Sequence, residues 1–71
     1  MVGSELRTAR IAAGLTQEEL AANAGISRNY VSLLELDQKS PTLEVFFKIC
    51  RALNVRGSTV LARVERKQSN E

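Results

Sequence analysis

Apolar residues recur along the chain with the spacing of amphipathic helices, and short groups of turn-forming residues separate them. Because side chains three and four positions apart share one face of a helix, this spacing predicts helices rather than strands. The helices are expected at about residues 3–13, 17–24, 28–36, 43–53 and 59–66. The chain is therefore predicted to be all-α and to fold as a five-helix orthogonal bundle.

Residues that favour helix ends support these boundaries. Gly25 follows the second predicted helix, where glycine readily takes the left-handed backbone conformation. Thr16 and Glu19 form a capping box, because each side chain can bond to the backbone amide of the other residue. Ser27 is a second N-cap residue. The stretch Arg56-Gly57-Ser58 is expected to separate the last helix from the helix before it.

The segment Gln17–Glu35 is the most informative part of the sequence. Its two predicted helices are joined only by Gly25-Ile26-Ser27, which is too short for an antiparallel pair, so they must meet at a steep angle. Ala21 is small where the helices come closest, while Val31 and Leu34 are apolar toward the angle between them. This combination favours a helix-turn-helix DNA-binding unit over a generic pair of amphipathic helices.

Composition and charge fit a small soluble domain with a nucleic-acid partner. Hydrophobic residues make up 44% of the 71 residues and charged residues 25%, and the formal net charge is +2. No apolar run is long enough to cross a membrane, and the first residues do not form a signal peptide. Cys50 is the single cysteine and cannot form an intrachain disulfide. These features together predict a cytoplasmic protein.

The residues that catalysis and ligand binding usually need are missing from the sequence. There is no histidine, and the four glycines are too far apart to form a phosphate-binding loop. We therefore expect no enzymatic activity, no cofactor, no metal and no small-molecule ligand.

The chain resembles the phage repressor/Cro-type helix-turn-helix family, which has the lambda-repressor-like fold. The matching residues are Arg10, Gly14-Leu15-Thr16-Gln17, Glu19-Leu20-Ala21, Ala24-Gly25-Ile26-Ser27, Tyr30-Val31-Ser32, Leu34-Glu35, Ser40-Pro41-Thr42-Leu43-Glu44, Ile49 and Ala52-Leu53. The resemblance implies a domain that binds double-stranded operator DNA as a homodimer and regulates transcription.

Base contacts are expected from the outward positions of the third helix, whose N-terminal part enters the major groove in this fold. Arg28 can make a bidentate contact to guanine, and Asn29 can make one to adenine. Ser32 can bond to several base edges, and Leu33 can pack against a thymine methyl group.

Phosphate contacts are expected chiefly near helix N-termini, where free backbone amides favour an anion. The candidates are Thr16, Gln17, Ser27 and Lys39. The resemblance assigns Gln17 to the DNA backbone and implies a partly buried ion pair between Arg10 and Glu35. Arg7 is a weaker candidate that fits a solvated face equally well.

Three positions depart from the family pattern. Leu33 and Leu36 stand where polar or basic residues are usual, and Asp37 is expected to lie unfavourably close to the DNA backbone. These departures allow two hypotheses. The chain is either a DNA-binding protein of modest affinity or an antitoxin-like module that binds another protein through these leucines.

The C-terminal part of the chain has more apolar residues than so small a core requires, which predicts a dimer interface. That interface is expected to include Phe47, Val60, Leu61 and Val64, although the same side chains can instead close the core of one subunit. Residues 1–66 are therefore predicted to form a DNA-binding domain with a C-terminal dimerisation helix, and residues 67–71 a flexible tail.

Overall fold

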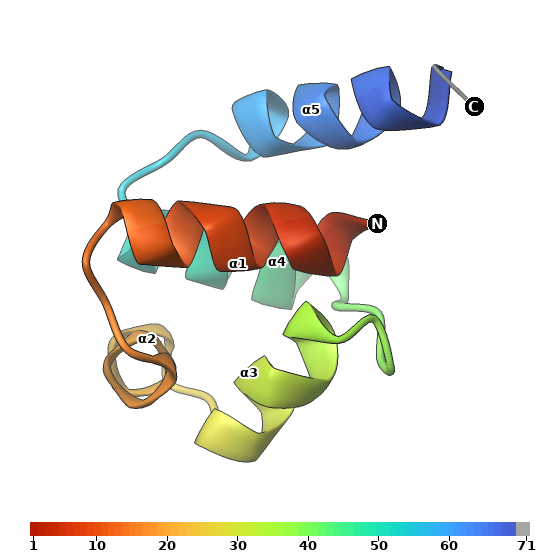
Figure 1. Ribbon diagram of the computed structural model, residues 1–71. Helices are drawn as coiled ribbons and strands as arrows, with labels where there is room; N and C mark the ends of the chain where they lie inside the picture. The colour runs from red at the N-terminus through yellow and green to blue at the C-terminus, as the bar shows by residue number, and fades with distance from the viewer. Residues whose placement is uncertain (70–71) are drawn as a thin grey trace.

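The computed structural model describes residues 1–69, which form five helices and no strand (Figure 1). The helices are α1 (Val2–Ala12), α2 (Gln17–Ala24), α3 (Arg28–Glu35), α4 (Leu43–Ala52) and α5 (Gly57–Ser69). The predicted all-α bundle is confirmed, and four of the five helices lie within two residues of their expected bounds. No helix among these residues has the length and apolar character needed to cross a membrane.

The helix ends follow the chemistry expected from the sequence. The Thr16 hydroxyl accepts a hydrogen bond from the Glu19 amide at 3.0 Å, and the Glu19 carboxylate accepts one from the Thr16 amide at 2.9 Å. The Ser27 hydroxyl accepts from the Tyr30 amide at 3.0 Å. Gly25 ends α2 at φ 72°, a left-handed conformation that costs a residue with a Cβ about 1–2 kcal/mol. These caps fix the short turn between α2 and α3.

A single core joins the five helices. It consists of Leu6, Ala9, Leu20, Ala21, Ala24, Val31, Leu34, Phe46, Ile49, Cys50, Leu53 and Val60. Figure 1 shows α5 running along α1 on the side opposite α2 and α3, and α1 contacts both α3 and α5. The scaffold therefore supports α3 from α1 and α2, while one side of α3 remains uncovered.

The prediction for the C-terminal helix was wrong at both ends. Helix α5 begins at Gly57, inside the expected separator, and Gly57 packs closely against two aromatic rings. A Cβ at this position would lie 2.6 Å from Cε1 of Phe47 and 3.0 Å from Cε2 of Phe46. The helix also continues to Ser69, so Lys67 is helical and not part of a flexible tail. Of the predicted tail, residues 70–71 lie outside the described residues.

Two apolar positions differ from their predicted environments. Leu43, expected on the inward stripe of α4, is 65% exposed because it begins the helix before the core is reached. Val60, expected at a dimer interface, is only 2% exposed and belongs to the core of the single chain. The core of the single chain therefore includes part of the apolar surface that the sequence predicted for a dimer interface.

Candidate nucleic-acid interface

The four base-contact candidates lie on one side of α3. Arg28 and Asn29 are exposed in its first turn, and Ser32 and Leu33 follow four residues later as half-buried side chains. Side chains four residues apart share a helix face, so the four form one continuous surface. The opposite side of α3 is held in the core by Val31. Polar side chains at the N-terminal end of this surface can reach into a groove of nucleic acid.

Arg28 makes an ion pair that was not predicted from the sequence. Its Nε atom lies 3.4 Å from Oε1 of Glu18, the second residue of α2. Both side chains remain mostly exposed, at 63% and 76%. The pair links the N-terminal ends of α2 and α3, and Arg28 stays at the surface.

The phosphate-contact candidates occupy the starts of α2 and α3 and the loop after α3. Thr16 and Ser27 act as the caps already described, and both residues are exposed. Gln17 begins α2, but its Nε2 atom donates to Oε1 of Glu35 at 3.1 Å, so its side chain has a structural role as well. Lys39 is exposed, and its backbone amide donates to the Leu33 carbonyl at 3.3 Å, which holds the loop against α3.

A groove runs between α1, the start of α2 and α3. Its volume is about 510 Å³, and it is lined by Ser4, Arg7, Gln17, Ser32, Glu35 and Leu36. The groove brings Arg7 to the same surface as Gln17 and Ser32. In the sequence, Arg7 is only a weaker phosphate-contact candidate, because the neighbours of an exposed α1 residue depend on how the helices pack.

The predicted ion pair between Arg10 and Glu35 is present, and Glu35 is also one of the residues that line this groove. Arg10 Nε donates to Glu35 Oε2 at 2.7 Å and Arg10 Nη2 donates to Oε1 at 3.1 Å, while Nη1 donates to the Leu15 carbonyl at 2.9 Å. Hydrogen bonding to Glu35 raises the pKa of Arg10 above its usual value. Together with Gln17, the pair connects α1, the turn before α2, and the end of α3.

Comparison with known proteins identifies this arrangement. A family model described as helix-turn-helix matches residues 6–60. The chain belongs to the helix-turn-helix family. The resemblance seen in the sequence is thereby confirmed, together with the fold that it implied.

Its relatives in this family include regulators and a controller protein. The uncharacterized HTH-type transcriptional regulator y4dJ of Sinorhizobium fredii is 40% identical over 55 residues, 78% of this chain and 71% of that protein. The transcriptional regulator ClgR of Mycobacterium tuberculosis is 39% identical over 61 residues, 86% of this chain but only 54% of ClgR. The crystal structure of the restriction-modification controller protein C.AhdI from Aeromonas hydrophila has a TM-score of 0.81 and 36% identity, covering 83% of this chain and 89% of that one.

In this helix-turn-helix chain, Asp37 does not present a free charge to the outer face of α3. It ends the α3 segment at φ 58°, and its carboxylate accepts from the N-terminal ammonium of Met1 at 2.6 Å and from the Gly3 amide at 3.0 Å. These two hydrogen bonds lower the pKa of Asp37. The carboxylate thus caps the N-terminus of α1, where a negative charge is stabilising.

Replacing Asp37 by Asn should therefore make stability less dependent on pH. The pKa of the Asp37 carboxyl is lower in the folded than in the unfolded chain, where it is about 3.9. The ionised carboxylate therefore stabilises the fold above about pH 3.9, and this contribution is lost as the pH falls from there through the lower pKa of the folded state. Wild type should exceed Asp37→Asn in its urea midpoint at pH 7, and the difference should shrink by pH 3. A difference that stays constant from pH 7 to pH 3 would show that the charge of Asp37 contributes nothing.

The remaining apolar candidates for a dimer interface lie on α4 and α5. Phe47 and Leu61 are each 43% exposed, and Val64 is half-buried. Val60 is excluded from such a surface by its burial. Three of the four predicted interface residues therefore remain at the surface of α4 and α5.

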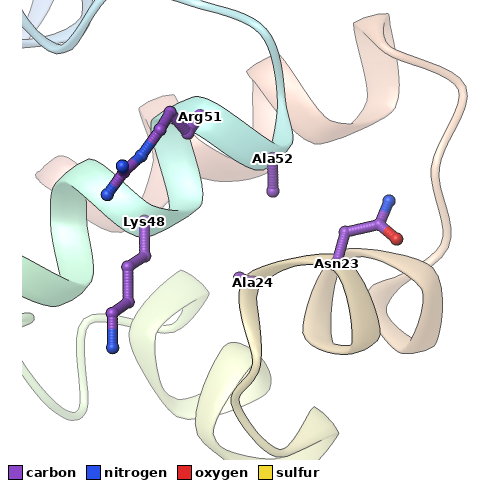
Figure 2. A pocket seen from close by; sticks show the side chains of 5 residues that line it. All are labelled: Asn23, Ala24, Lys48, Arg51 and Ala52. Atoms are coloured by element: carbon purple, nitrogen blue, oxygen red, sulfur yellow. The ribbon is translucent and has the colours of Figure 1, made fainter.

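A second group of cations lies away from the groove beside α3. Figure 2 shows Lys48 and Arg51 on α4 and Asn23 near the end of α2, around a pocket of about 340 Å³. Lys48 lies 3.6 Å from Glu44, one turn earlier in α4. None of these residues lines the groove that contains Gln17, so Arg51 provides a comparison for charges on the α3 surface.

Proposed function

We propose that this chain is a cytoplasmic, sequence-specific DNA-binding regulator of transcription. The proposal rests on one observation above all: the exposed first turn of α3 carries Arg28 and Asn29 beside the capped N-termini of two helices. Arginine and asparagine can each read a base through two hydrogen bonds, and helix N-termini attract phosphates. The family and its regulator relatives support the same function, and they support binding rather than catalysis.

The regulator acts as a homodimer on a palindromic operator. The exposed side chains of Phe47 and Leu61, with Val64, supply the apolar surface that joins the two subunits. A two-fold axis places the two copies of α3 about 34 Å apart, which matches one turn of DNA between half-sites.

Within each half-site, Arg28, Asn29, Ser32 and Leu33 contact bases. Gln17 and Lys39 contact the DNA backbone together with Thr16 and Ser27, and Arg7 adds a charge from the groove. Because Gln17 also bonds to Glu35, it couples the backbone contact to the core ion pair.

A second candidate function is binding to another protein, as an antitoxin binds its toxin. The observation that favours it is Leu36, which is 63% exposed at the edge of the groove beside Arg7. An apolar side chain there adds nothing to phosphate binding but can contribute to a protein interface.

Selection from a pool of random DNA duplexes separates the two functions. We expect an inverted repeat to be enriched, Arg28→Ala to lose preference at one base pair of each half-site, and Gln17→Ala to weaken all duplexes alike. Lys39→Ala should reduce the slope of log affinity against log salt by about 1 per subunit, whereas Arg51→Ala should leave it nearly unchanged. Circular dichroism of each variant checks that the fold is retained. If no sequence is enriched and binding disappears near physiological salt, the protein-binding function is favoured instead.

A further inference from the structure

The contact between Glu18 and Arg28 has a geometry that matters for base recognition. These residues lie at the starts of α2 and α3, and the 3.4 Å separation joins Glu18 Oε1 to the Nε atom of Arg28. A guanidinium group is planar and carries donors on Nε and on two terminal nitrogens. Since Glu18 faces Nε, both terminal nitrogens remain available for a bidentate contact to guanine.

The same contact contributes little to the stability of the folded chain. Both side chains are mostly exposed, at 63% for Arg28 and 76% for Glu18, and exposed ion pairs have small effects on stability. The N-terminus of α2 already has a capping box formed by Thr16 and Glu19. The contact between Glu18 and Arg28 is therefore not required to begin the helix.

Glu18 also carries a cost for a DNA-binding protein. It follows Gln17 directly and places a negative charge close to the expected position of a phosphate. Repulsion by this charge weakens binding to every DNA sequence. A negative charge in the first turn of α2 also stabilises the helix, so the choice between DNA sequences, and not stability, is the property that tests a role of Glu18 in recognition.

We propose that Glu18 is a positioning residue that orients Arg28 for base recognition and lowers overall DNA affinity in exchange for specificity. This inference rests on the proposed function. By attracting Nε, Glu18 favours positions of the Arg28 side chain in which the terminal nitrogens are directed away from α2. Without it, Arg28 binds neighbouring phosphates as readily as a base, because arginine makes strong contacts to both.

The test compares Glu18→Gln with Glu44→Gln. Both changes remove one negative charge from an exposed ion pair, but Glu44 lies on α4 and contacts Lys48 at 3.6 Å. Binding is measured to the selected operator and to four duplexes that differ at the base pair identified by Arg28→Ala. The double variant Glu18→Gln/Arg28→Ala completes the cycle.

Glu18→Gln should bind non-specific duplex about three- to tenfold more tightly and lose about three- to tenfold of the base preference at that one position. Glu44→Gln should leave the preference unchanged, and Glu18→Gln should have no effect on it once Arg28 is absent. If Glu18→Gln strengthens binding to all four duplexes equally, Glu18 acts only through its charge and the inference is wrong. If wild type itself selects no DNA sequence, the proposed function fails and the inference fails with it. If wild type selects an operator but Glu18→Gln leaves the base preference unchanged, only the inference fails.

Discussion

Replacing Glu35 by Gln is expected to lower the free energy of unfolding by about 3 kcal/mol. The side chains of Glu35 and Arg10 are only 3% and 12% exposed, so the change leaves a buried guanidinium without its countercharge. It also places an amide NH₂ where an oxygen now accepts a hydrogen bond. A domain of 71 residues has roughly 4–10 kcal/mol of stability in total, so this loss removes a large part of it. Urea denaturation at low temperature measures this loss. Thermal unfolding measures it too, and the midpoint should fall by roughly 15 °C.

Two further variants show whether burial of the charge is the cause. Glu44→Gln removes one partner of an exposed pair and should change stability by less than about 0.5 kcal/mol. The double variant Arg10→Met/Glu35→Met removes both charges and should be more stable than Glu35→Gln, because no unpaired buried charge remains. It should still be less stable than wild type, since the Gln17 amide and the Leu15 carbonyl lose their partners. Equal midpoints for wild type and Glu35→Gln would contradict this account.

Replacing Gly3 by Ala should destabilise the fold by about 2–3 kcal/mol. A Cβ on Gly3 would overlap the Leu34 carbonyl oxygen and lie 2.7 Å from the Glu35 carbonyl oxygen and 2.9 Å from Oδ1 of Asp37. Two of these three atoms are backbone atoms at the end of α3 and cannot rotate away. The N-terminus of α1 must therefore move away from α3, which weakens the bond from the Gly3 amide to Asp37.

Gly14→Ala is the matched control, because it makes the same change without a collision. Gly14 has φ 74° and nothing within 4 Å of an added Cβ, so only the left-handed conformation is penalised, by about 1–2 kcal/mol. Helix propensity alone makes the opposite prediction for Gly3, since alanine inside a helix is favoured by about 1 kcal/mol. A Gly3→Ala variant more stable than wild type in urea would show that α1 does not pack this closely on α3.

The local parts of this regulator follow from its sequence. The capping box of Thr16, the cap at Ser27 and the left-handed Gly25 depend on neighbouring residues alone, so the turn between α2 and α3 was predictable. The inward positions of Val31 and Leu34 follow from helical periodicity, which in turn places Arg28 and Asn29 outward. The family resemblance added the ion pair of Arg10 and Glu35, which no local rule supplies.

Other features were decided only by tertiary structure, because they depend on residues far apart in the chain. Gly57 is the first residue of α5 and not a break before it, and the rings of Phe46 and Phe47 occupy the space where its Cβ would lie. Val60 is buried, which the composition of α5 alone could not distinguish from an exposed dimer surface. The Asp37 carboxylate accepts from the amide of Gly3, 34 residues earlier in the chain, and so caps the N-terminus of α1. Periodicity determines which side of a helix is apolar, but only the packing of the helices determines what covers that side.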